Sequence, residues 1–320
     1  MRFRLEQRDQ LQRWAEQGFF TADEWQQLRE HNRLQPDSDE WRGLLQQLSV
    51  WAGAMALGSG MIFFLAFNWA DMSRFLKLGL AAGLLTGMTL MAAWLADSLL
   101  ARRAVLFGCA LVTGALLALI GQIYQTGADV WQLFAVWALL MLPWALLARS
   151  SACWLLWVLV LNLALGRWLA LHAVGFWRPS DQLVLLPVAL NLLLFLLFES
   201  QSSRLLQQPR LWLVRVTGLL ALVSVLPGAL MAFWDSAFIV QLLAWGGLCA
   251  LGIPWCLKGR RDLPLLAVQL FSGVAVVASA LGRVLEALDG FLLFNGLALW
   301  VILGSVLVSV WLQRLHREQH

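Results

Sequence analysis

Residues 104–124 read AVLFGCALVTGALLALIGQIY, and QTGAD follows at 125–129. The first of these segments carries no charged residue. At about 1.5 Å per residue, a helix of its length crosses the ~30 Å hydrocarbon layer of a bilayer. The end of this run and the loop after it, Gly121 to Asp129, gather two glutamines, a tyrosine and an aspartate. The stretch therefore predicts a membrane-spanning helix that ends in a polar group.

The composition of the whole chain agrees with this prediction. Of its 320 residues, 60% are hydrophobic and only 13% are charged, and the mean hydropathy is +0.71. Soluble domains carry roughly 25% charged residues. A chain this apolar cannot cover itself with a polar surface, so we expect an all-α, polytopic integral membrane protein in contact with the lipid bilayer.

Apolar runs of spanning length recur along the chain and predict about ten transmembrane helices. They cover residues 48–69, 75–96, 104–124, 130–148, 151–169, 182–198, 211–234, 237–257, 263–281 and 291–312. The chain then divides into a segment before the spans, 1–47, a transmembrane domain, 48–312, and a short tail, 313–320.

The distribution of positive charge predicts the orientation of these spans. With the N terminus placed in the cytoplasm, 18 of the 23 Lys and Arg residues fall on the inside and 5 on the outside. Arg102 and Arg103, Arg149, Arg204, and Lys258 lie at every second turn, as the positive-inside rule requires. We therefore expect both termini to be cytoplasmic.

The segment before the first span is polar and predicts a short cytoplasmic helical hairpin. Gly18 is placed to end one helix. Thr21-Ala-Asp-Glu24 is a capping-box pattern, which predicts that the next helix starts there. The segment has no charged stretch followed by an apolar one, so we expect no cleavable signal peptide.

Small residues recur at every fourth position in two predicted spans. Gly79, Gly83 and Gly87 lie in the second, and Ala110, Gly114 and Ala118 in the third; this spacing lets helix backbones approach closely in lipid. We expect the first three spans to cluster, with packing inside one subunit or a homodimer face as the two interpretations.

Two polar groups end the first and third spans on the predicted outer side. They comprise Asn68, Trp69, Asp71, Gln122, Tyr124, Gln125 and Asp129. Unpaired polar groups are costly in hydrocarbon, so these side chains should pair or face water. One interpretation makes them interfacial caps and helix contacts without a ligand; the other makes them a site for a substrate or ion.

Three asparagines lie near the middle of other predicted spans, at Asn162, Asn191 and Asn295. Asparagine commonly forms hydrogen bonds between membrane helices, so a structural role explains each of them. No acidic residue lies near the middle of a span. This weakens the interpretation as a proton-coupled pump, because such pumps usually need a buried carboxylate.

The sequence contains no HExxH, GxSxG or P-loop pattern, and no Cys or His spacing typical of a metal site. The four cysteines lie inside apolar runs, which favours packing roles. Arginines interleaved with aromatics on a soluble domain are also missing, so we expect no nucleic acid partner. We expect no enzymatic activity, no metal and no cofactor.

Phe63-Phe-Leu-Ala-Phe-Asn-Trp69, Lys77 and Leu119-Ile-Gly-Gln-Ile-Tyr-Gln125 resemble motifs of a bacterial membrane protein family, domain of unknown function 2157. The resemblance covers about the first 150 residues, including the N-terminal hairpin. It implies a multi-span protein of the inner membrane and supplies no activity, substrate or catalytic residue.

Two functions from different classes remain open. The first is a non-enzymatic module of the bacterial inner membrane that assembles with other membrane proteins or with itself. The alternative is a transporter or channel for a small solute, with its outer gate at the polar group around Tyr124.

Overall fold

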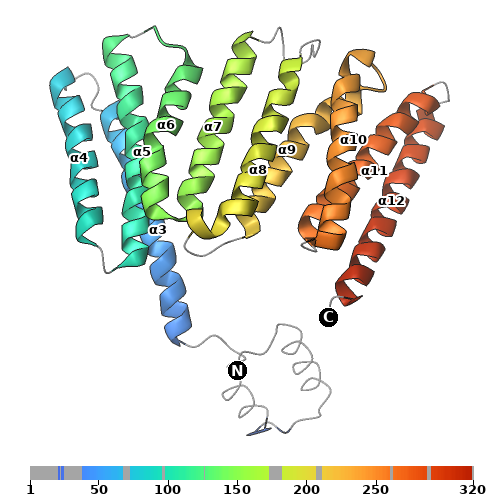
Figure 1. Cartoon of the computed structure of the whole chain (residues 1–320), viewed down its shortest axis with the longest axis horizontal. Helices are drawn as coiled ribbons and strands as arrows, with labels where there is room; N and C mark the ends of the chain where they lie inside the picture. Colours follow the sequence, from blue (N-terminus) through green and yellow to red (C-terminus); the bar gives the residue numbers. More distant parts are fainter. Residues whose placement is uncertain are drawn as a thin grey trace.

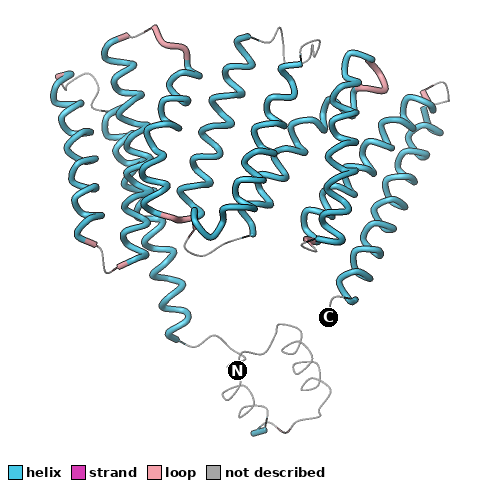
Figure 2. The backbone as a smooth tube through the Cα atoms, in the orientation of Figure 1, coloured by secondary structure: helices cyan, strands magenta, loops and turns pink. Residues whose placement is uncertain are grey.

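The computed structural model describes residues 21, 23–24, 38–67, 73–95, 98–125, 127–172, 182–206, 211–259, 262–286 and 290–318. Every secondary-structure element in these ranges is a helix (Figure 2), which confirms the all-α prediction. The elements are α3 (Ser38–Phe67), α4 (Arg74–Trp94), α5 (Leu99–Tyr124), α6 (Val130–Ala148), α7 (Ser151–His172), η1 (Gln182–Leu185), α8 (Leu186–Leu205), α9 (Leu211–Met231), η2 (Ser236–Phe238), α10 (Ile239–Pro254), η3 (Trp255–Gly259), α11 (Leu263–Leu285) and α12 (Gly290–Glu318).

In the described part of the chain, eight segments are apolar and long enough to cross a membrane. They are α4 to α7, α9, the continuous stretch Ser236–Gly259 around α10, α11 and α12. Helices α3 and α8 occupy the first and sixth predicted positions, and the apolar part of α8, Leu186–Gln201, is shorter. The total of ten spans and the cytoplasmic location of both termini stay predictions.

The helices form an open row in which most of them pack on their neighbours in the sequence (Figure 1). Helix α4 packs on α5, α5 on α6 and α6 on α7; further along, α8 packs on α9, α9 on α10 and α11 on α12. Helix α3 also packs on α5, and α9 on α11. The row therefore has two ends, α4 and α12. The start of α3 and the end of α12 lie at the same edge of the row.

Tryptophan side chains connect neighbouring helices through hydrogen bonds. The indole N–H of Trp137 donates to the carbonyl of Ala110 at 2.8 Å, and that of Trp157 donates to the carbonyl of Ala138 at 2.9 Å. Other indoles donate to hydroxyls on an adjacent helix, as Trp245 does to Ser272 at 3.0 Å. These contacts join α6 to α5, α7 to α6 and α10 to α11. In hydrocarbon, each replaces an unsatisfied N–H with a bond between helices.

The two stripes of small residues differ in whether a neighbouring helix covers them. On α5, Ala110 is fully buried, and a Cβ added to Gly114 would lie 2.3 Å from the ring of Trp137. The stripe on α5 thus receives a tryptophan from α6. On α4, Gly79, Gly83 and Gly87 are exposed, and a Cβ added there would meet no described atom within 4 Å.

The α4 stripe therefore does not pack inside the described chain, contrary to the interpretation that both stripes serve internal packing. Helix α4 contacts α5 through its opposite face, where Ala81, Met88 and Ala92 are buried. Small residues permit close approach but do not dictate which face a neighbour covers, and in α4 the larger side chains fill the contact. The expected clustering of the first three helices is found, since α3 and α4 both pack on α5.

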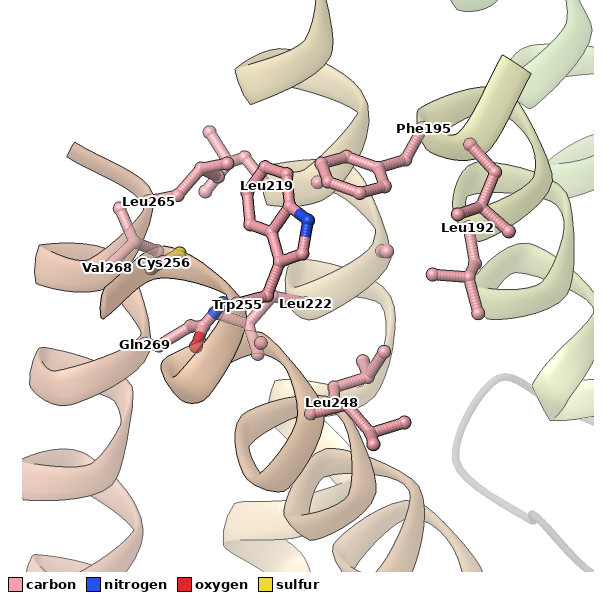
Figure 3. A pocket seen from close by; sticks show the side chains of 15 residues that line it. Leu192, Phe195, Leu219, Leu222, Leu248, Trp255, Cys256, Leu265, Val268 and Gln269 are labelled. Carbon is pink, nitrogen blue, oxygen red and sulfur yellow. The ribbon is translucent and has the colours of Figure 1, made fainter. Parts of the chain in front are cut away.

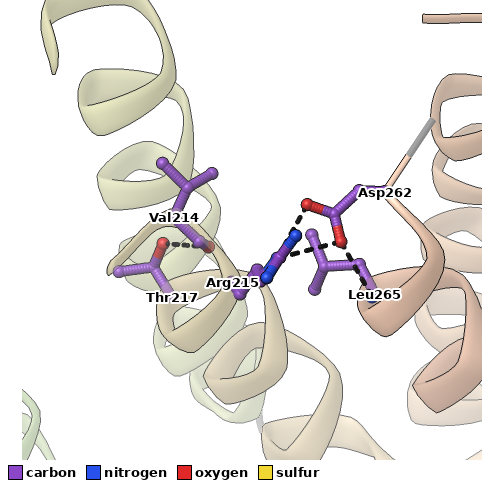
Figure 4. Close-up of polar contacts among 5 residues, drawn as sticks. All are labelled: Val214, Arg215, Thr217, Asp262 and Leu265. Atoms are coloured by element: carbon purple, nitrogen blue, oxygen red, sulfur yellow. Dashed lines mark hydrogen bonds and ion pairs between the residues drawn. The ribbon is translucent and has the colours of Figure 1, made fainter. Parts of the chain in front are cut away.

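An ion pair joins α9 to the start of α11 (Figure 4). The Nε–H of Arg215 donates to both carboxylate oxygens of Asp262, at 2.9 and 3.1 Å. The buried Asp262 carboxylate also accepts the backbone N–H of Leu265, which makes it the N-cap of α11. One carboxylate thus ends a loop, caps a helix and fixes that helix against α9.

The predicted capping box before the first span is confirmed. The backbone N–H of Thr21 donates to the Glu24 carboxylate at 2.9 Å, and the backbone N–H of Glu24 donates to the Thr21 hydroxyl at 3.3 Å. Residues 1–20 and 25–37, with most of the predicted hairpin, lie outside the described ranges.

Candidate functional site

The polar residues after the third predicted span lie in the turn between α5 and α6. Helix α5 ends at Tyr124, which is 55% exposed. Gln125 follows in the left-handed conformation, with φ of 43°, which lets the chain leave the helix. Asp129 is the N-cap residue of α6, and its backbone N–H donates to the side-chain oxygen of Gln132 at 3.2 Å. Gln125 and Asp129 therefore have roles in ending one helix and starting the next.

The first polar group falls outside the described ranges, so the structure does not place Asn68, Trp69 or Asp71 against this turn. Gln122 lies in the last turn of α5 and is exposed, as are Gln125 and Asp129. Neither of the two cavities described below is lined by these side chains. A ligand site at this end of α5 stays a prediction.

A buried lysine lies at the same end of the α4 and α5 pair. Lys77 is only 5% exposed, and it takes part in interactions within the chain. One turn further along α4, Ala81 packs on Leu119 of α5, with Ile123 beside them. A cation thus lies at the end of the α4 and α5 pair that carries Tyr124. Sequence reasoning did not include Lys77 in the site, although it is one of only two lysines in the chain.

Two of the three mid-span asparagines contact each other. The side-chain amide of Asn191 donates to the Asn162 oxygen at 2.7 Å, and that of Asn162 donates to the Asn191 oxygen at 3.1 Å. The pair connects α7 to α8, and Asn191 is fully buried. Asn295 is exposed on α12 and donates to the carbonyl of Phe291 in its own helix. The three residues therefore do not form one site.

Two glutamines fill the space beside glycines of a neighbouring helix. Gln241 of α10 is 2% exposed and packs against Gly228 of α9, where an added Cβ would lie 2.6 Å from it. Gln269 of α11 packs in the same way against Gly252 of α10, at 2.4 Å. The Oε1 atoms of both are buried and have no hydrogen-bond partner among the described residues. Buried acceptors of this kind are rare in folded proteins.

Gln269 lines an apolar cavity of about 330 Å³ between α8, α9, α10 with η3, and α11. Figure 3 shows Trp255 among the lining side chains, with Phe195 on one side and Gln269 on the other. The rings of Phe195 and Trp255 meet edge to face, with centroids 5.3 Å apart. Apart from Gln269, the described lining consists of apolar side chains, glycines and Cys256. The cavity thus suits an apolar chain better than a charged solute.

The titratable side chains of the described residues are scattered. No group of three or more His, Cys, Asp or Glu side chains within those ranges is arranged to hold a metal ion. The four cysteines, Cys109, Cys153, Cys249 and Cys256, are buried free thiols.

No curated protein and no solved structure matches the chain. One family model does match it, with the description "Predicted membrane protein (DUF2157)", over residues 12–154. This range contains α3 to α6, the turn of Tyr124 and the buried Lys77, and it ends just inside α7. Over residues 12–154, the chain is therefore similar to the family of predicted membrane proteins named domain of unknown function 2157.

Proposed function

We propose that this protein is a non-enzymatic module of the bacterial inner membrane that assembles laterally with another membrane-spanning helix through α4. The partner helix presents small side chains, because only such a helix can bring its backbone close to a glycine stripe. The observation that carries the proposal is the free glycine face of α4.

Helix α4 stands at one end of the open row, so a second protein in the bilayer can reach its outer face (Figure 1). Gly79, Gly83 and Gly87 follow one another at every fourth position on that face and are exposed. Leu76 and Leu80 on the same side are also exposed. In lipid, no hydrophobic force acts between helices, and close backbone contact is what holds them together. A glycine stripe that meets no neighbour among the described residues supports assembly with another protein.

The excess of positive charge on the predicted inside supports a plasma-membrane location with cytoplasmic termini. The polar residues around Tyr124 support the same structural role, since Gln125 and Asp129 end and begin helices.

The test is co-purification from native membranes in mild detergent. Two differently tagged copies of the full chain are produced together, and the proteins recovered with one tag are identified. The wild type should retain either its second copy or one reproducible membrane partner, and Gly83→Leu should lose it because the side chain separates the helix backbones. Recovery of a lone wild-type monomer contradicts the proposal.

Gly247→Leu on α10 is the matched control. Gly247 is also an exposed glycine within a membrane-spanning segment, with open space around it. The Gly247→Leu variant should leave the complex intact. Equal loss in Gly83→Leu and Gly247→Leu would point to general damage by a bulky side chain, and retention of the partner by Gly83→Leu would remove α4 from the interface.

A further inference from the structure

A second cavity, of about 280 Å³, lies where α3, α5, the turn between α6 and α7, and α9 come together. Its lining includes two cations, two hydroxyls and two indoles. These are Arg103, Arg149, Ser150, Ser151, Trp51 and Trp212. It belongs to neither the α4 face nor the apolar cavity around Trp255.

The cavity lies at the ends of several membrane-spanning segments. Arg103 is in the second turn of α5, Arg149 directly follows the last residue of α6, and Trp212 is the second residue of α9. Residues at such positions lie at the level of the lipid headgroups, where arginine and tryptophan are both favoured. The cavity is therefore placed where a headgroup, rather than an acyl chain, would meet it.

The lining chemistry matches a phosphate group. Guanidinium groups bind phosphate oxygens through paired, charge-assisted hydrogen bonds. Ser151 is the first residue of α7, so backbone N–H groups of that helix start at the same place and favour an anion. Ser150 is buried, and its hydroxyl accepts the backbone N–H of Cys153 at 3.3 Å, which fixes the turn beneath the cavity.

Both arginines and one tryptophan of the lining have contacts within the chain. Arg103 and Arg149 both take part in interactions within the protein. The described lining of the cavity contains no acidic side chain. Trp51, whose ring meets Phe107 of α5 edge to face, forms an apolar wall on one side.

We propose that this cavity binds the phosphate of an anionic phospholipid headgroup, with Arg103 and Arg149 as the main ligands. Basic pockets between membrane helices recognise such headgroups. A zwitterionic headgroup would bring its own cation next to two guanidinium groups and should bind more weakly. The indole walls favour the lipid over free phosphate, because they contact the glycerol and upper acyl carbons that free phosphate lacks.

Native mass spectrometry of the full-length protein, released from detergent, tests the proposal. The protein is titrated with phosphatidylglycerol and with phosphatidylcholine of the same acyl chains. The wild type should bind phosphatidylglycerol more tightly. Arg103→Gln and Arg149→Gln should each weaken this binding about fivefold, the value for removing one positive charge near a headgroup. Ala152→Phe, which keeps both charges and fills the cavity, should also weaken it.

Arg102→Gln is the matched control, because Arg102 lies next to Arg103 on α5 and does not line the cavity. It should bind as the wild type does. Arg149 is an exposed loop residue, so its variant remains informative if substitution of Arg103 impairs folding. Wild-type affinity in both Arg149→Gln and Ala152→Phe would overturn the proposal. Inorganic phosphate that binds alone as tightly as the lipid would overturn the lipid assignment.

Discussion

Asn162 of α7 and Asn191 of α8 exchange side-chain hydrogen bonds, at 2.7 and 3.1 Å, inside the apolar layer. Each amide also donates to a carbonyl of its own helix, Asn162 to Val158 and Asn191 to Pro187. The pair thus satisfies its polar groups without water. This arrangement makes it a contact between two helices rather than the lining of a path for a solute.

Removing either member of this pair should destabilise the protein. Asn191→Ala leaves the Asn162 oxygen without its partner, and a double-mutant cycle with Asn162→Ala should give a coupling free energy of about 1 kcal/mol. The measurement is the free energy of unfolding in mixed micelles. Asn295→Ala is the control and should change it little, because Asn295 is exposed and bonds its own helix. Additive single effects would contradict the pairing.

Trp157→Phe should lower the free energy of unfolding by about 1 kcal/mol, because it removes the hydrogen bond to the Ala138 carbonyl and keeps an aromatic ring. The control is Trp94→Phe, since Trp94 is 85% exposed on α4. It should leave stability unchanged. A loss in Trp157→Phe that is no larger than that in Trp94→Phe would contradict a stabilising role of this hydrogen bond.

The positions of the apolar helices could be predicted because hydropathy and length are properties of single segments. A contact between helices could be expected for Asn162 and Asn191 because asparagine commonly forms hydrogen bonds between membrane helices. The contact between Asn162 and Asn191, which Asn295 does not join, depends on how whole helices are rotated and how deep they lie in the membrane. The sequence of a single segment does not determine this rotation or depth.

The tryptophan hydrogen bonds had no signal in the sequence. The indole N–H of Trp157, for example, donates to the backbone carbonyl of Ala138. Every residue has a backbone carbonyl, so the sequence does not indicate which one accepts the bond. The glycine stripes show a related limit. Their spacing indicates a helix face that another helix can approach closely, but not which face is used. Trp137 of α6 packs against the stripe that contains Gly114, and no described residue packs against Gly83. The burial of Lys77 was likewise decided by the packing of α4 on α5.

Gly114→Ala should destabilise the protein by about 1–3 kcal/mol, the usual effect of adding atoms to a filled site. The new Cβ would lie 2.3 Å from the Trp137 ring, which is held by its bond to Ala110 and cannot easily move. Gly247→Ala, with open space around it, is the control and should be neutral. Thermal unfolding in detergent compares the stability of the two variants. Unchanged stability in Gly114→Ala would contradict the close contact between Gly114 of α5 and Trp137 of α6.

Asp262→Ala should lower the free energy of unfolding by about 2 kcal/mol, since it removes a helix cap and strands the Arg215 guanidinium. Arg215 is partly exposed, so water compensates some of the loss. Asp262→Asn keeps an acceptor for the Leu265 N–H and should show the smaller effect. Equal losses in the two variants would mean that the ion pair, and not the cap, accounts for the stabilisation.

The capping box at Thr21 should make the start of its helix sensitive to acid. The backbone N–H of Thr21, and then its hydroxyl, hold the pKa of the Glu24 carboxyl below its ordinary value of 4.5. A lowered folded pKa means that the stabilisation is present above the unfolded value and is lost as the pH falls through the folded one. Carbon-13 NMR of labelled glutamate in the full chain, assigned with Glu24→Gln, follows this titration. Thr21→Ala should return the pKa toward 4.5, and an unchanged pKa in that variant would contradict the assignment of the two hydrogen bonds as its cause.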